Sequence, residues 1–133
     1  MHPRFLFVCT GNTCRSPVAE ALAEARGVAA ESAGVAAQRG DGAAPYAARA
    51  LRMARGLDLS GHTPQNVADL DLSIFDQVVA VAPSVAQRLR ADHDPLDDRL
   101  VIWSIPDPYG GSMADYRLCL EQIDAALDRL LDP

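Results

Sequence analysis

Apolar and polar residues are arranged along the chain in blocks that predict strands followed by helices. Two short, mainly apolar segments, Arg4–Val8 and Gln77–Ala82, are typical of strands buried on both faces of a sheet. An alanine-rich segment at Ala30–Ala33 and an apolar run at Leu100–Trp103 predict two further strands. We therefore expect four strands, separated by long connections.

Between the strands, apolar residues recur every three or four positions, which is the spacing of one helix face. This spacing predicts helices from Val18 to about Arg26, from Pro45 to about Arg55, from Ser84 to about Asp92 and from Ala114 to Leu131, with a short helix at Val67–Leu72. The inward positions of these helices are predicted to be Val18, Leu22, Ala25, Ala47, Leu51, Ala54, Val85, Leu89, Tyr116, Leu120, Ile123, Leu127 and Leu130.

Strands that alternate with helices predict an α/β fold, because helical crossovers join parallel strands and cover both faces of their sheet. The chain of 133 residues has the length of a single domain, 1–133. Ligands of such sheets bind beyond the carboxyl ends of the strands. We therefore look for functional residues directly after each predicted strand.

Composition narrows the class of protein further. The net charge of −6 argues against nucleic acid as the main partner. No apolar run approaches the length of a membrane span, no signal peptide is evident, and no nucleotide-binding or metal-binding motif is present, so we expect no membrane and no cofactor. An odd number of cysteines, three, favours a reducing compartment, and we expect a cytoplasmic monomer.

The segment between the first strand and the first helix holds the most informative motif, and residues 9–17 read CTGNTCRSP. A loop in this position directs main-chain N–H groups and the positive end of a helix dipole toward one point. Gly11 and Asn12 tolerate the left-handed backbone that such a loop needs. Ser16 suits the N-cap of the helix and Pro17 its first position. The segment is therefore predicted to bind a phosphate-like anion.

Cys9 and Arg15 give this loop its chemistry. An anion-binding loop favours the thiolate form of Cys9, which is the nucleophilic form, and the planar guanidinium of Arg15 can hold two oxygens of a phosphoryl group. Asp107 follows the last strand, so it should reach the same edge of the sheet, and Pro108 keeps it in extended backbone. We predict that Asp107 protonates the departing atom and then activates water.

Two segments resemble the low-molecular-weight protein tyrosine phosphatases: FVCTGNTCRSP near the start and DPYGGSMADY near the end. The order, with Cys9 first and Asp107 late, matches that family, and the similarity extends to SAGVAA, GLDLSGH and FDQVVAV. The resemblance implies a three-layer α/β sandwich with a four-stranded parallel sheet in flavodoxin-like order. It also implies a phosphorylated protein as substrate and a cysteinyl-phosphate intermediate, with no metal or cofactor.

The same resemblance implies roles for residues within the loop. Ser16 should hydrogen-bond the Cys9 thiolate, Asn12 should hold the unusual backbone, and Cys14 should form a reversible, protective disulfide with Cys9. The phosphate-binding residues are expected to be Thr10, Gly11, Asn12, Thr13, Cys14, Arg15 and Ser16.

Thr13 bears on the identity of the substrate. The tyrosine phosphatases usually have Ile at this position, and Thr resembles a bacterial subgroup of protein arginine phosphatases. A hydroxyl suits a polar guanidinium, whereas Ile packs on a phenyl ring and would desolvate guanidinium N–H groups. Tyr109 can stack on either group. We predict a preference for phosphoarginine with residual activity on phosphotyrosine.

Two other functions fit the same loop. Arsenate reductases of this fold need two further cysteines in the region that corresponds to Ala80–Arg90, which contains none, while Cys119 lies on the last helix. A non-catalytic phosphate-binding module would not need Cys9, Arg15 and Asp107 together. We expect His62 to satisfy a local hydrogen bond rather than to act as a base.

Overall fold

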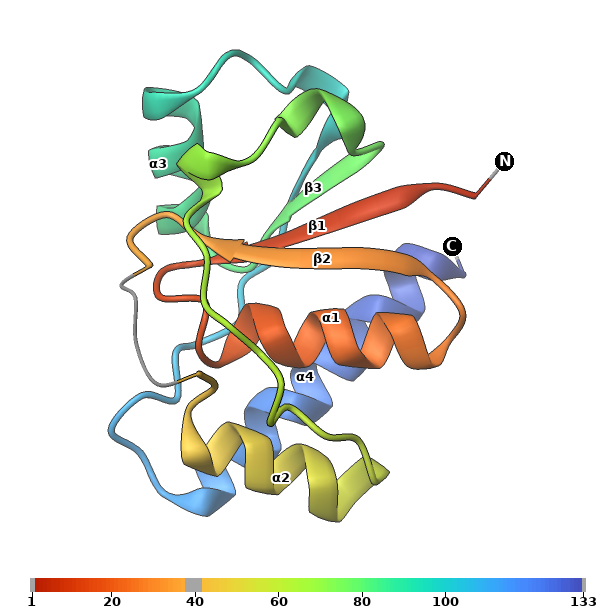
Figure 1. The fold of residues 1–133 in the computed structure, drawn as a ribbon, viewed down its shortest axis with the longest axis vertical. Helices are drawn as coiled ribbons and strands as arrows, with labels where there is room; N and C mark the ends of the chain where they lie inside the picture. Colours follow the sequence, from red (N-terminus) through yellow and green to blue (C-terminus); the bar gives the residue numbers. More distant parts are fainter. Residues whose placement is uncertain (1, 38–41, 133) are drawn as a thin grey trace.

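A computed structural model describes residues 2–37 and 42–132, and these contain a four-stranded parallel sheet (Figure 1). The strands are β1 (Arg4–Cys9), β2 (Ala29–Gly34), β3 (Gln77–Ala80) and β4 (Leu100–Ile102). Their spatial order is β2-β1-β3-β4, which confirms the flavodoxin-like order. The strand β3 ends two residues earlier than predicted, since the chain turns there toward a helix that begins at Pro83.

Helices cover both faces of the sheet, which confirms the three-layer architecture. They are α1 (Arg15–Ala25), α2 (Pro45–Arg55), α3 (Pro83–Asp92) and α4 (Met113–Leu131). Helices α1 and α4 lie against one face, α3 covers the other, and α2 packs against α4 (Figure 1). Among the described residues, no helix is long and apolar enough to cross a bilayer.

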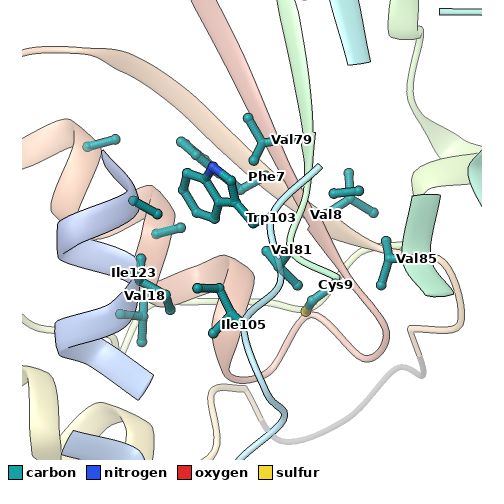
Figure 2. Packing of buried hydrophobic residues seen from close by; sticks show 14 of the residues in the cluster. Phe7, Val8, Cys9, Val18, Val79, Val81, Val85, Trp103, Ile105 and Ile123 are labelled. Atoms are coloured by element: carbon teal, nitrogen blue, oxygen red, sulfur yellow. The ribbon is translucent and has the colours of Figure 1, made fainter. Parts of the chain in front are cut away.

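The side chains of β1 alternate between the two helical layers (Figure 2). Phe7 packs against Trp103, with ring centroids 5.6 Å apart, on the side of α4. Val8 points the other way, toward Val85 of α3. Because both faces of the strand are covered, every residue of β1 after Arg4 is buried. This burial explains the continuous apolar run and places Cys9 at the end of a rigid strand.

Two predicted helix starts are wrong. Helix α1 begins at Arg15 with Cys14 as N-cap, so Ser16 and Pro17 lie inside the first turn. Ser16 cannot cap the helix because its backbone is already helical and its hydroxyl contacts Cys9. Helix α3 begins at Pro83, which places the exposed Ser84 one position inside the helix and leaves no side-chain cap.

Some predicted inward positions are also wrong. Ala25 and Ala54 are exposed because each lies in the last turn of its helix, beyond the elements that cover the apolar face. Leu130 is half-buried for the same reason. The helix expected at Val67–Leu72 is replaced by two 3₁₀ turns, because the side chain of Asp71 accepts a hydrogen bond from the Ser73 N–H and starts a second turn.

Candidate active site

Cys9 lies at the carboxyl end of β1, where the chain enters the loop of residues 10–14. Figure 2 shows it near Val81 and Ile105, which follow β3 and β4. Only 3% of its surface is exposed. The sheet edge that the sequence predicted for the site is therefore where the structure places the thiol.

Two donors converge on the sulfur of Cys9. The Asn12 N–H donates to Sγ at 3.2 Å, and the Ser16 hydroxyl lies 2.8 Å from Sγ. The Asn12 side chain donates to Ser16 Oγ at 2.8 Å, and the single hydroxyl proton is shared between the sulfur and the Ala33 carbonyl, which lies 3.3 Å from Oγ. Hydrogen bonds of this kind are stronger to a charged acceptor than to a neutral one. The predicted contact of Ser16 with Cys9 is confirmed.

The loop also presents main-chain N–H groups that no protein group accepts. Within residues 2–37 and 42–132, no hydrogen bond is formed by the main-chain N–H groups of Thr10, Gly11, Thr13, Cys14, Arg15 and Ser16. These donors surround the start of α1, whose dipole adds positive potential. The sequence predicts that these donors bind an anion above Cys9, and this stays a prediction.

Asn12 supplies the left-handed backbone of the loop, with φ of 56°. Gly11 does not adopt a positive φ, so that part of the prediction is wrong. The polar side chain of Asn12 stabilises the conformation from within the core. It donates to Ser32 Oγ at 2.9 Å, and its Oδ1 accepts from the main chain of Gln65 at 3.0 Å.

Three further residues support this loop, and the roles of two of them, Ser32 and Gln65, were missed at the level of sequence. His62 was expected to form a local hydrogen bond, but its ring donates from Nε2 to the Asn12 carbonyl at 2.7 Å, fifty positions away. Ser32 donates to Glu20 as well as receiving from Asn12, and Gln65 also donates to the Ser32 carbonyl at 2.9 Å. Local patterns carry no signal for such contacts, because each of them depends on how distant segments pack.

Arg15 connects the loop to the segment after β4. Its guanidinium is buried and donates to the Ile105 carbonyl at 2.9 Å, and Nη2 lies 3.8 Å from Asp107 Oδ2. The Asp107 side chain is 51% exposed, and its Oδ1 accepts from the Tyr109 N–H at 3.1 Å. The structure therefore brings the predicted acid beside the predicted phosphate-binding arginine, although 92 positions separate them.

The two residues predicted to contact substrate lie at the surface of this site. Tyr109 is 83% exposed, directly after the acid-bearing turn. Thr13 is half-buried, and its carbonyl accepts from Ala44 at 2.7 Å, which ties the loop to the start of α2. Within the part of the chain that the structure describes, no three His, Cys, Asp or Glu residues could hold a metal ion.

Cys14 and Cys119 form a pair of neighbouring buried thiols. A hydrogen bond between them raises the pKa of Cys14, and burial acts in the same direction. The same hydrogen bond lowers the pKa of Cys119; burial opposes this, and the Arg15 guanidinium reinforces it. The Cys9–Cys14 disulfide that the resemblance implies stays a prediction.

Comparison with known proteins places this site in one class of enzyme. Residues 4–133 match the family described as low molecular weight phosphotyrosine protein phosphatase, and the chain belongs to that family. A solved tyrosine phosphatase of this type from T. tengcongensis is 33% identical, with a TM-score of 0.90 and 98% of both chains covered.

Two curated relatives carry different activities in their names. A protein-arginine-phosphatase from Geobacillus stearothermophilus is 30% identical, covering 97% of this chain and 94% of the relative. A low molecular weight protein-tyrosine-phosphatase from Streptomyces coelicolor is 34% identical, covering 96% and 91%. Relatives of similar identity thus carry names for two different phosphorylated side chains, phosphoarginine and phosphotyrosine.

Proposed function

We propose that this protein hydrolyses phosphorylated side chains of proteins, with Cys9 as nucleophile, Arg15 as phosphate ligand and Asp107 as acid and base. The observation that carries the proposal is the set of donors around one sulfur: the Asn12 N–H, the Ser16 hydroxyl and the loop N–H groups above them. A thiolate held there faces a phosphoryl group bound by the loop.

The geometry supports a two-step displacement. In the first step, Cys9 Sγ attacks phosphorus while Arg15 and the loop N–H groups hold the equatorial oxygens, and Asp107 gives a proton to the leaving atom. In the second step, Asp107 takes a proton from water, which attacks phosphorus and releases the thiolate. Ser16 stabilises that thiolate again as it leaves. The exposure of Asp107 fits a group that meets both substrate and water.

The reaction is tested by hydrolysis of p-nitrophenyl phosphate and by acid quench during turnover. Cys9→Ser should lose about a thousandfold or more in kcat, and mass spectrometry should find the trapped phosphate on the peptide that contains Cys9. Cys119→Ala is the matched control, because it removes a buried thiol outside the proposed mechanism. Full activity in Cys9→Ser would overturn the proposal.

We extend the proposal to substrate choice through Thr13. Its hydroxyl provides a polar partner at the loop, and the exposed Tyr109 ring provides a flat surface for a guanidinium or a phenyl ring. The measurement is kcat/KM on matched phosphoarginine and phosphotyrosine peptides. Thr13→Ile should shift the ratio toward phosphotyrosine by about tenfold or more. An unchanged ratio would remove Thr13 as the determinant.

A further inference from the structure

Gln65 lies where the segment after α2 runs beside the end of β2. Gly34 forms an isolated parallel bridge with Asn66, and the Gly34 N–H donates to the Gln65 carbonyl at 2.9 Å. Figure 1 shows this segment passing the end of β2. Because β2 is an edge strand of the sheet, the segment occupies the position that a further strand would take.

The hydrogen bonds of Gln65 differ from those of a regular parallel pair. If the pairing continued toward the start of β2, the Gln65 N–H would donate to the Ser32 carbonyl, because the bonds of a parallel pair recur at alternate residues. Instead, this N–H donates to Oδ1 of Asn12 at 3.0 Å. The Gln65 side chain makes the missing bond, since its Nε2 donates to the Ser32 carbonyl at 2.9 Å. Gln65 thus binds the strand with its side chain and the loop of residues 10–14 with its main chain.

The main-chain N–H of Gln65 also determines which way the Asn12 amide faces. An N–H can only donate, so the atom opposite it is the acceptor Oδ1. Nδ2 then donates to Ser16 Oγ at 2.8 Å and to Ser32 Oγ at 2.9 Å. The Ser32 hydroxyl accepts from Asn12 because its own proton goes to Glu20. The polar atoms of the Asn12 side chain are therefore all paired within the protein, where Asn12 has no exposed surface.

Ser16 connects this orientation of Asn12 to the sulfur of Cys9. Ser16 Oγ lies 2.8 Å from Sγ and accepts from Asn12, so its own proton is available to the sulfur or to the Ala33 carbonyl. A reversed Asn12 amide would present Oδ1 to Ser16 and would take that proton instead. The direction of the Asn12 amide therefore decides whether Ser16 can donate to Cys9.

We propose that Gln65 is a positioning residue for the reaction proposed above: its side chain binds the Ser32 carbonyl, which leaves its main-chain N–H to hold Asn12 in the orientation that supports Ser16. Without the side-chain donor, the Ser32 carbonyl would lack a partner, and an unpaired carbonyl in a buried position is costly. The N–H that regular pairing would supply is that of Gln65, so Asn12 would lose its anchor. The effect on catalysis rests on the proposed function, whereas the hydrogen bonds can be tested without it.

Gln65→Met tests this inference, because methionine has a similar length and no N–H donor. We expect kcat for p-nitrophenyl phosphate to fall by about tenfold while KM changes by less than about twofold, since the loop N–H groups that would hold the phosphate stay in place. Gln77→Met is the matched control and should keep wild-type kinetics, because Gln77 is a half-buried glutamine at the start of β3, at the other end of the sheet from Cys9. A wild-type kcat in Gln65→Met would overturn the inference.

Two further variants separate positioning from a general loss of structure. Gln65→Arg keeps an N–H donor on a long side chain and should restore kcat to within about threefold of the wild type. Asn12→Gly removes the side chain and tolerates the left-handed backbone; it should lower kcat in the wild type but by less than about twofold in Gln65→Met. Additive losses would show that Gln65 does not act through Asn12, and no recovery in Gln65→Arg would show that the lost N–H is not the cause.

Nuclear magnetic resonance tests the hydrogen bonds themselves, whether or not the protein is a phosphatase. The Asn12 side-chain NH₂ group donates to two buried hydroxyls, so its protons should exchange with water at least about tenfold faster in Gln65→Met than in the wild type. Equal exchange rates would overturn the inference. Faster exchange in the variant, together with no hydrolysis by the wild type, would support the inferred hydrogen bonds and contradict the proposed function alone.

Discussion

Gly34 shows how one residue of a neighbouring strand limits the shape of the phosphate loop. A Cβ at this position would lie 2.5 Å from the Thr10 carbonyl oxygen and 3.0 Å from the Asn12 nitrogen. Both atoms belong to the main chain of the loop. The end of β2 also donates to this region, because the Val35 N–H binds the Cys9 carbonyl at 2.9 Å. Gly34 is therefore required by close approach of two backbones.

We expect Gly34→Ala to displace the loop and lower activity more than stability. The added methyl group cannot be relieved by a side-chain rotation, since it meets backbone atoms. Activity on p-nitrophenyl phosphate should fall by about tenfold or more, because small misplacements of a catalytic loop are costly. Gly61→Ala is the matched control, as no described atom lies within 4 Å of its Cβ. Equal activity in both variants would contradict the steric argument.

The ionisation of Glu24 affects the free energy of unfolding. Burial raises the pKa of Glu24 to about 7, and a hydrogen bond with Glu20 acts in the same direction. These carboxyl groups, one turn apart on α1, face a surface pocket that Asp58 and His62 also line. The folded protein thus keeps a proton between pH 4.5, the ordinary value, and about 7, where the unfolded chain has lost it.

The free energy of unfolding should therefore fall as the pH rises through this window, since the folded state binds more protons there. Above about pH 7 the Glu24 carboxylate of the wild type is repelled by Glu20, whereas Glu24→Gln lacks this charge. Glu24→Gln should remove this part of the pH dependence and raise Tm at pH 8 relative to the wild type. Thermal melts from pH 4.5 to 8.5 measure the Tm of both proteins. Parallel curves of Tm against pH would show that Glu24 does not cause the pH dependence.

At the scale of elements, Asp124 joins three helices. It lies on α4 and forms ion pairs with Arg26, just after α1, and with Arg55 at the end of α2, where Oδ2 is 2.9 Å from Nη2. Burial opposes the charge on Asp124, but hydrogen bonds from Arg55 and Arg26 lower its pKa below the usual range. The network lies at the ends of α1 and α2 remote from the loop.

Asp124→Asn should destabilise the protein by about 1 to 2 kcal/mol, because two guanidinium groups lose a shared, half-buried partner. A lowered carboxyl pKa contributes stability above the unfolded value that is lost as the pH falls through the folded value. The difference between wild type and variant should therefore shrink below about pH 4. Urea titrations at pH 7 and pH 3.5 measure this difference, with Asp132→Asn as an exposed control at the C-cap of the same helix.

The helices and strands also show which parts of the structure can be predicted from the sequence. Helix α2 has the predicted bounds, because Pro45 starts it and Gly56, with φ of 67°, ends it. The placement of Cys9, Arg15 and Asp107 at one edge of the sheet could be predicted, because the motif and the ends of the strands are both visible in local sequence. The contacts of Ser32 and Gln65 with Asn12 were missed, and the hydrogen bond of His62 was expected to be local, since each contact depends on the packing of segments that are distant in sequence.

The whole molecule carries a net charge of −6, yet its proposed site binds an anion. The attraction is local, from Arg15, the loop N–H groups and the start of α1, and it acts within a few ångströms. At longer range the field of the protein repels a negatively charged substrate. Salt distinguishes the local attraction from the long-range repulsion. It screens exposed charges beyond a Debye length of about 10 Å at 0.1 M and affects short contacts much less.

Phosphopeptides with acidic flanking residues should therefore react faster as salt increases. Between about 10 and 200 mM sodium chloride, kcat/KM for such a peptide should rise by about two- to fivefold, because screening removes the repulsion during encounter. A peptide with the same phosphorylated residue and basic flanks should show a fall of similar size, while kcat for both stays constant. The pair of peptides is its own control, since general salt effects on the protein would change both in the same direction. If both rates move together, the long-range field does not influence the encounter, and the local donors around Cys9 determine substrate capture alone.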